Sequence, residues 1–378
     1  MTTHPPIHLD HAATSWPKAP GVVDAMARWY DELGVSADRG DSEASRSVAD
    51  AVDAVRSKLA RRLGMSPARC AFTSGATESI NLFLRGFLRP GDRVVTTAIE
   101  HSALARPLVA LCSEAGIGTV TVECDGAGAV DAQHVVEASR STRPRLIALS
   151  HASNVTGAIV DVAPIVAAAR ELEARVLLDA SQTVGAIDVD LGADAIAGSA
   201  HKSLLGPPGL GFLAVRDGLE ITPHKLGGTG SARPSDAQPP HWPAAFEAGT
   251  PNTPAILGLG AALDWLAAHD AAAARRRALE AIDELRAALR RRPGVRCLGP
   301  EHGDLRLPIL SFTADDLDPA EIGALCDLAG LRVRSGFHCA PWIHRALGTE
   351  AMGTVRVSPG PFVTADEVLR VASVLVRA

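Results

Sequence analysis

The chain has 378 residues, of which 47% are hydrophobic and only 4% aromatic, and its formal net charge at pH 7 is -6. This length and apolar content are enough for a large domain and a smaller one, with cores filled mainly by aliphatic side chains. The modest negative charge, without any basic stripe, argues against a nucleic-acid partner, and no apolar run is long enough to span a membrane.

The cysteines and the first residues of the chain indicate the cellular compartment. The six cysteines are scattered, with neither a Cys-x-x-Cys pair nor the spacing of a zinc site, so we expect no metal and no disulfide framework. Met1 to Asp10 lack the basic start and apolar run of a signal peptide. We therefore expect a cytoplasmic protein.

Strand-like and helical patterns alternate over the first 215 residues. The apolar runs that we interpret as buried strands are Cys70–Thr73, Arg93–Thr97, Thr119–Val122, Leu146–Ser150, Val176–Asp179, Ala195–Gly198 and Gly211–Val215. Helical patterns separate several of them, as in Ala103–Ala115, Asp131–Ala138 and Val162–Ala174. This order predicts an α/β fold with a mostly parallel sheet that is covered on both faces.

The pattern changes after residue 218. Gly227–Pro243 is rich in Gly, Pro, Ser and Asp and is predicted to be a loop, either a linker or a segment near the active site. Helical patterns at Leu257–Leu266, Ala271–Arg291 and Thr364–Val376 and strand-like runs at Leu307–Phe312 and Leu331–Arg334 indicate a second, α+β unit. We expect a large domain of residues 19–260 and a small domain made of residues 1–18 and 261–378.

Two charged residues follow neighbouring predicted strands. Asp179 ends one strand, and Lys202 comes just after the next one, in Ser199-Ala-His-Lys202. Ligands of open α/β sheets bind at these strand ends, where a carboxylate can pair with the protonated ring of pyridoxal 5'-phosphate (PLP) and a lysine can bond to its aldehyde. Alone, the aspartate is more commonly a helix cap and the lysine a surface residue. Their pairing favours the PLP site.

A third signal lies in Thr73-Ser-Gly-Ala-Thr-Glu78, where a glycine and hydroxyl residues follow a strand and open a helix. Free backbone N–H groups at such a helix start favour an anion, here the phosphate of PLP. An ordinary capping box, with a Ser or Thr followed by Glu, explains the same residues equally well.

Together these motifs resemble the cofactor site of fold-type I PLP enzymes, in the class V aminotransferase branch. The further segments that carry the resemblance are Leu9-Asp-His-Ala-Ala-Thr14, Glu100-His-Ser102, Ser150-His-Ala-Ser-Asn-Val-Thr-Gly157, Phe246-Glu-Ala-Gly-Thr-Pro-Asn252 and Arg334-Ser-Gly-Phe-His-Cys-Ala-Pro341. The last segment is similar to the catalytic loop of group II cysteine desulfurases, which include selenocysteine lyases. The resemblance runs from Leu9 to the C-terminal helix.

The resemblance implies roles for individual residues around PLP. Lys202 would form the Schiff base, Asp179 would pair with the ring nitrogen, and His101 would stack on the ring. The other contacts to the cofactor would be Ala76, Thr77, Asn154, Gln182, Ser199, His201 and, from the second subunit of a homodimer, Thr250.

The resemblance also implies how the substrate is used. Arg334 and Arg356 would clamp the carboxylate of L-cysteine, a task that suits a planar bidentate donor. Cys339 would take the sulfur as a persulfide and pass it to a thiol or to an acceptor protein, leaving L-alanine. His338 and the two arginines could lower the pKa of this thiol, although His338 is as easily an ordinary loop residue.

Alternative functions follow from the same residues. A selenocysteine lyase, another C–S lyase or an aminotransferase would keep the PLP site, but transamination needs no thiol at position 339. A catalytically silent protein of this fold, which only binds a partner, would be expected to have lost the lysine or the aspartate, and neither is lost here.

Overall fold

The computed structural model describes residues 6–35, 37, 42–230 and 236–376. Its main feature is a seven-stranded sheet in the order β2-β8-β7-β6-β5-β3-β4. These strands are β2 (Cys70–Thr73), β3 (Arg93–Thr97), β4 (Gly118–Val122), β5 (Leu146–Ser150), β6 (Arg175–Asp179), β7 (Ala195–Ser199) and β8 (Gly211–Val215). Only β8 runs against the others, so the predicted mostly parallel sheet is confirmed.

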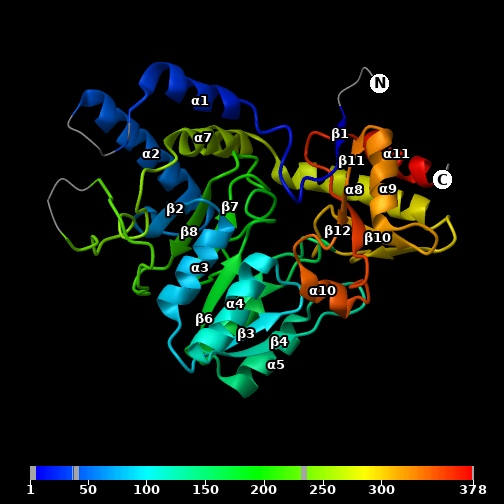
Figure 1. Ribbon diagram of the computed structural model, residues 1–378, viewed down its shortest axis with the longest axis horizontal. Helices are drawn as coiled ribbons and strands as arrows, with labels where there is room; N and C mark the ends of the chain where they lie inside the picture. The colour runs from blue at the N-terminus through cyan, green and yellow to red at the C-terminus, as the bar shows by residue number, and fades with distance from the viewer. Residues whose placement is uncertain (1–5, 36, 38–41, 231–235, 377–378) are drawn as a thin grey trace.

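Helices cover both faces of this sheet. Alternate residues of each strand point to opposite sides, and because both sets are apolar, both faces need a cover. One face packs against α3 (Ala76–Phe87) and α4 (Ser102–Ala115), through residues such as Ala148 of β5. The other face, which includes Ile147 and Leu149, packs against helices α2 (Glu43–Arg62), α5 (Ala132–Thr142), α6 (Val162–Glu171) and α7 (Thr253–Ala268). Figure 1 shows α1 (Val22–Arg28), with the π-helical turn Trp29–Leu33 that follows it, lying over α7.

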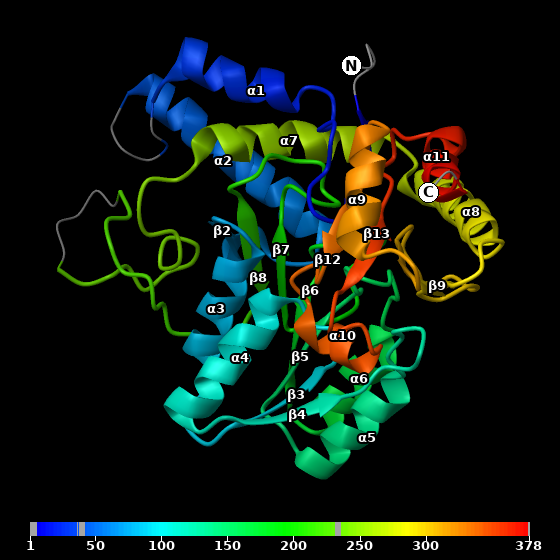
Figure 2. The same cartoon turned by 45° about the vertical axis from the view of Figure 1, so that its right-hand side comes forward.

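A smaller α+β unit follows, as predicted. Its antiparallel sheet has the order β12-β13-β10-β9, built from β9 (Val295–Leu298), β10 (Leu310–Ala314), β12 (Arg334–Gly336) and β13 (Thr354–Val357). Helices α8 (Ala271–Leu289), α9 (Pro319–Leu328) and α11 (Ala365–Val376) supply the rest of its core. Figure 2 shows this unit beside the large sheet, and α10 (Pro341–Ala346) begins just after Cys339, whose carbonyl meets the start of α4.

The N-terminal segment joins the two units. Strand β1 (Ile7–His8) pairs with β11 (Leu331–Arg332) of the smaller unit. Farther along, the backbone N–H of Ser15 donates to the carbonyl of His201, 2.7 Å away in the large unit. The predicted boundary at residues 260 and 261 falls inside α7, and the division into domains stays a prediction.

Some predicted bounds differ from the structure for local reasons. The strand expected at Leu307–Phe312 begins only at Leu310, because Pro308 has no N–H to give to a ladder. The run Leu331–Arg334 is divided between β11 and β12, which belong to different sheets. The described parts of the predicted loop, residues 227–230 and 236–243, contain no helix or strand, and residues 231–235 lie outside the described part.

Candidate active site

A pocket lies where the carboxyl ends of the parallel strands face the smaller sheet. Strands β5, β6 and β7 end at Ser150, Asp179 and Ser199, so the side chains that follow them converge on one edge. The pocket has about 630 Å³ of empty volume. Its lining residues are Ala12, Ala13, Ala76, Thr77, His101, Ala103, Asn154, Asp179, Ser181, Ser199, His201, Lys202, Arg334, His338, Cys339 and Arg356.

Lys202 and Asp179, predicted from neighbouring strand ends, both line this pocket. Asp179 is held by Ser181, whose backbone N–H and hydroxyl both donate to Oδ1, at 3.0 and 2.6 Å. Burial lowers the pKa of Lys202, and the negative charge of Asp179 opposes that shift only in part. The amine is therefore more easily deprotonated than an ordinary lysine, which suits a nucleophile and proton carrier.

His101 presents a neutral ring to the pocket. It is the N-cap of α4, where Nδ1 accepts a hydrogen bond from the N–H of Ala103 at 3.0 Å. Because Nδ1 is an acceptor, the ring proton is on Nε2. Burial, followed by the charge of Lys202, lowers the pKa of His101 to about 4, so the ring stays uncharged at neutral pH.

Glu100, next to His101, is fully buried and had no role in the sequence prediction. It accepts hydrogen bonds from the N–H and the hydroxyl of Ser150, both at 2.8 Å, and so links the end of β3 to the end of β5. Burial raises its pKa to about 7. The side chain fixes the loop on which His101 stands.

The start of α3 forms one end of the pocket. The N–H of Ala76 donates to the hydroxyl of Ser199 at 3.0 Å, and the hydroxyl residue Thr77 is exposed beside it. Gly211 allows this approach: a Cβ atom at that position would stand 2.4 Å from the Cα atom of Gly75. The start of α3, Ser199 and the neighbouring His201 thus form a site with several donors that could hold a phosphate group.

The capping-box interpretation of the start of α3 also has support. The carboxylate of Glu78 accepts a hydrogen bond from the N–H of Ser74 at 2.6 Å, as in one half of a capping box. The N-cap itself is Gly75, which has no side chain to cap the helix. The glutamate therefore binds the N–H of Ser74, outside the helix, and does not occupy the first-turn N–H groups of α3.

Two arginines of the smaller sheet face the pocket side by side. Arg334 of β12 and Arg356 of β13 are direct cross-strand partners. Arg356 is buried, donates to the carbonyl of Asn154 at 2.9 Å, and forms an ion pair with Asp10. Five N–H donors leave the guanidinium with capacity for a ligand. The role of Asp10, in the N-terminal motif, was not predicted.

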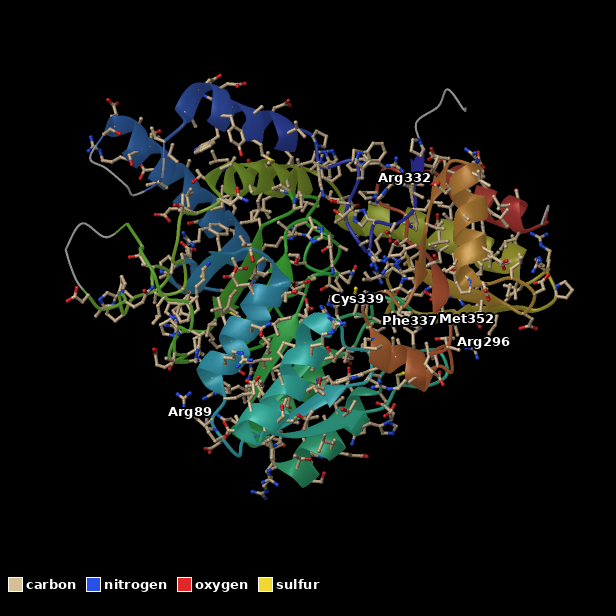
Figure 3. All side chains as sticks on the ribbon, in the orientation of Figure 1. Arg89, Arg296, Arg332, Phe337, Cys339 and Met352 are labelled. Atoms are coloured by element: carbon tan, nitrogen blue, oxygen red, sulfur yellow. The ribbon has the colours of Figure 1, made fainter. Side chains whose placement is uncertain are left out.

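Cys339 is exposed at the edge of the pocket, in the turn between β12 and α10 (Figure 3). Nη2 of Arg334 is 3.9 Å from its sulfur. His338 does not provide the positive charge that the sequence suggested, because burial lowers its pKa to about 2 and its ring turns inward to Thr354. Arg334 is therefore the cation nearest the thiol.

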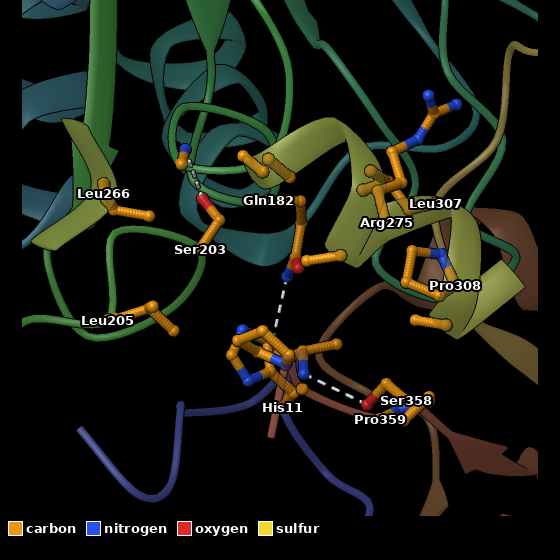
Figure 4. A pocket seen from close by; sticks show the side chains of 18 of the residues that line it. His11, Gln182, Ser203, Leu205, Leu266, Arg275, Leu307, Pro308, Ser358 and Pro359 are labelled. Carbon is orange, nitrogen blue, oxygen red and sulfur yellow. Dashed lines mark hydrogen bonds between the residues drawn. The ribbon is translucent and has the colours of Figure 1, made fainter. Parts of the chain in front are cut away.

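Gln182 and Thr250 lie away from the center of the pocket. Gln182 does not line this pocket: its amide donates to the carbonyl of Ala12 at 2.9 Å, and its side chain faces the neighbouring apolar pocket shown in Figure 4. It also lines a small separate cavity together with Asp179 and Lys202. Thr250 is exposed and does not line the pocket of its own chain.

The described residues contain no group of His, Cys, Asp or Glu side chains that could hold a metal ion. Within the same residues, no helix has the length and apolar character needed to cross a membrane.

Comparison with known proteins identifies a family. Residues 7–371 match the family model for aminotransferase class-V. A cysteine desulfurase of Cronobacter sakazakii is 33% identical, over 99% of this chain and 93% of its own. A probable cysteine desulfurase of Pseudomonas aeruginosa is 36% identical, over 96% and 91%. The solved apo structure of a cysteine desulfurase from Thermococcus onnurineus superposes with a TM-score of 0.91 at 28% identity, covering 98% of this chain and 94% of its own.

Proposed function

The chain belongs to the aminotransferase class-V family and, within it, to the cysteine desulfurases, and on this basis we propose that it moves the sulfur of L-cysteine to Cys339 and releases L-alanine. The observation that carries the proposal is a single pocket in which Lys202 and Asp179 face Cys339 and two arginines. An aminotransferase has no use for the thiol, and a surface cysteine would have no lysine and aspartate opposite it.

Enzymes of this family are generally PLP-dependent, and the residues of the pocket fit that cofactor. Lys202 would hold PLP covalently, Asp179 would face its ring nitrogen, and His101 would lie against the ring. The phosphate would bind at the start of α3, with Ala76, Thr77, Ser199 and His201, and the 3-oxygen would be bound by Asn154 and Gln182.

When bound, PLP supplies an electron sink next to the substrate's Cα atom. The chain supplies the groups that move protons and hold the substrate. Lys202, with its lowered pKa, is the base that takes the Cα proton and later returns one. Arg334 and Arg356 bind the carboxylate and thereby turn the side chain of the substrate toward Cys339.

The sulfur transfer replaces the C–S bond of the substrate with an S–S bond on Cys339, and it needs no outside oxidant. The thiolate of Cys339 attacks the substrate sulfur, an S–S bond forms, and the C–S bond breaks. The electron pair of that bond stays with carbon, which takes a proton to become the methyl group of alanine. Nη2 of Arg334 lies 3.9 Å from the sulfur of Cys339 and donates to it. A second thiol, free or on an acceptor protein, then removes the extra sulfur.

The proposal extends to the assembly and the compartment. We propose a homodimer in which Thr250 reaches the phosphate site of the partner subunit, since Thr250 is exposed and does not line its own pocket. Light scattering tests this: a fully active monomer would show that Thr250 has no such task. All six cysteines are free, which suits the reducing cytoplasm.

A selenocysteine lyase or another PLP-dependent C–S lyase remains the second candidate. Selenium leaves carbon more readily than sulfur does, so a lyase of that kind would depend less on Cys339. Comparing rates of alanine formation from cysteine and from selenocysteine separates the two.

Borohydride reduction of the PLP-loaded protein, followed by peptide mass mapping, tests the cofactor site. The chain has only four lysines, at positions 18, 58, 202 and 225. Lys18 is the critical control, because it lies near His201 and burial lowers its pKa to about 8. We expect the reduced adduct on Lys202. An adduct on Lys18, or none, would overturn the assignment.

A further inference from the structure

The loop that carries Cys339 has an unusual backbone. His338 and Cys339, two consecutive residues with Cβ atoms, have φ angles of 49° and 56°, in the left-handed region. For such residues this conformation costs roughly 1–2 kcal/mol each, and it persists only where the surroundings hold it. The position of the thiol therefore depends on whatever binds this turn.

Both strained residues are held by donors from the large unit. The carbonyl of His338 accepts a hydrogen bond from Nδ2 of Asn154 at 2.7 Å. The carbonyl of Cys339 accepts one from the backbone N–H of Ser102, also at 2.7 Å, and so satisfies a free donor in the first turn of α4. The turn has one short-range bond of its own, from the N–H of Ala340 to the carbonyl of Phe337 at 2.9 Å.

Asn154 can bind this loop and a ligand at the same time. Its amide has two N–H donors and one carbonyl acceptor. One N–H is used by His338, and the side chain, which is 6% exposed, also lines the pocket. The second N–H and the carbonyl oxygen have no partner on the loop. The N–H can donate to a ligand oxygen in the pocket, and the carbonyl oxygen can accept from a ligand N–H or O–H.

We propose that Asn154 is a positioning residue for Cys339, which holds the strained His338–Cys339 turn through the carbonyl of His338 while its remaining amide groups face the cofactor. This inference rests on the proposed function for the meaning of Cys339, but the contact itself joins two residues of the chain directly. Loss of the amide leaves the Ser102 contact as the only direct tie between the strained carbonyls and the large unit. The turn then relaxes, and the thiol leaves its place beside Arg334.

Alkylation of Cys339 in PLP-free protein measures this effect directly. Iodoacetamide is added to the wild type and to Asn154→Ala, and the labelled peptides are quantified by mass spectrometry. Cys112 is exposed and far along the chain, so its rate is an internal reference in each sample. We expect the ratio of the Cys339 rate to the Cys112 rate to change about fivefold from its wild-type value, the population shift that corresponds to one net hydrogen bond of about 1 kcal/mol.

Gln182→Ala is the matched control. Gln182 is the other amide proposed to contact the 3-oxygen of PLP, but it donates to Ala12 and has no contact with the Cys339 turn. In PLP-loaded protein both variants should shift the visible absorption of the cofactor. In PLP-free protein only Asn154→Ala should change the alkylation of Cys339.

Asn154→Asp guards against a failure of the alanine variant to fold. It has the same size, lacks both N–H donors, and places a carboxylate against the carbonyl of His338, so the Cys339 ratio should change at least as much. If both variants keep the wild-type ratio, Asn154 does not position the turn. This outcome is separate from a failure of the desulfurase proposal, which would appear as an absent Lys202 adduct or an absence of alanine.

Discussion

The two walls of the pocket are built on different principles. The wall from the large sheet carries Lys202, Asp179 and Asn154 just beyond the ends of parallel strands, where a buried framework fixes their positions. The wall from the smaller unit carries Cys339 in a turn with left-handed backbone at two successive residues. The first wall holds its groups in place by itself, whereas the second is held in part by the first.

Exposure follows the same division. Asp179 and Asn154 are buried, but Cys339 is exposed. A group that holds a cofactor gains from a dry site, where its charge interactions are strong. A thiol that must pass sulfur to a second thiol has to be reachable. The comparison teaches that the large-sheet wall serves cofactor binding and proton transfer, while the wall from the smaller unit serves substrate binding and sulfur delivery, and each can be broken separately.

The largest expected effect comes from removing Lys202, the general base in the wall from the large sheet. Lys202→Ala should lower alanine formation from cysteine by at least about 10²–10⁴-fold, the usual contribution of a positioned acid–base group, with a further loss from the missing covalent link. Lys18→Ala, a change at the other lysine close to the pocket, should cost far less. A Lys202→Ala variant with near wild-type turnover would mean that the large-sheet wall does not carry the proton transfer.

The two arginines sharpen the comparison, because only Arg356 ties the walls together. Arg334→Ala should reduce kcat/KM by about ten- to a hundredfold, for one lost charged hydrogen bond, and leave the unfolding free energy nearly unchanged. Arg356→Ala should weaken substrate use similarly and also lower the unfolding free energy by about 3 kcal/mol, because it leaves Asp10 and the carbonyl of Asn154 without their partner.

Urea unfolding and steady-state kinetics on both variants provide the measurement, and the cofactor content of each variant should stay at the wild-type level. Equal stability of the two variants would show that Arg356 does not link the walls. An unchanged kcat/KM in either one would remove that arginine from the carboxylate site.

A smaller effect concerns the stability that the protein loses at low pH because of His338, which lies in the wall from the smaller unit. Burial lowers the pKa of His338 from its ordinary 6.5 to about 2. Below 6.5 the unfolded chain therefore binds a proton that the folded chain does not, so this histidine costs stability as pH falls. His338→Asn keeps a residue that tolerates left-handed backbone and should remove about 2 kcal/mol of the stability loss between about pH 7 and about pH 5.

Unfolding by urea at the two pH values, in the wild type and in His338→Asn, measures this difference. His134→Asn, the same change at an exposed histidine, is measured beside it as the control. A wild-type pH dependence in His338→Asn would mean that the ring of His338 becomes charged inside the folded protein.

The sequence predicted the large wall better than the small one, for a physical reason. Asp179 and Lys202 follow apolar strands directly, and parallel strands bring their carboxyl ends together, so residue spacing alone placed both in one pocket. The order and register of β12 and β13, which set Arg334 beside Arg356, join segments that are far apart in sequence. Only the resemblance to a family, and not a local pattern, indicated these arginines.

Contacts between the walls could not be predicted at all. The Asp10 ion pair joins residues at opposite ends of the chain, and the bonds to the carbonyls of His338 and Cys339 depend on backbone angles that no residue pattern specifies. The choice left open for His338, between a charged neighbour of the thiol and an ordinary loop residue, could not be made from sequence for the same reason, and the structure favours the second. Its position next to Cys339 in sequence says nothing of its ring, which the structure turns into the core.

The most direct test of the account is the fate of sulfur on Cys339. The wild-type protein is mixed with PLP and L-cysteine, its thiols and persulfides are trapped with an alkylating agent, and peptides are mapped beside those of Cys339→Ala. We predict one added sulfur atom on the Cys339 peptide of the wild type and none on its Cys112 peptide. In Cys339→Ala, alanine formation from cysteine should collapse, while alanine formation from selenocysteine should be reduced less. If Cys339→Ala makes alanine from cysteine at the wild-type rate, the persulfide mechanism is contradicted and the thiol is incidental.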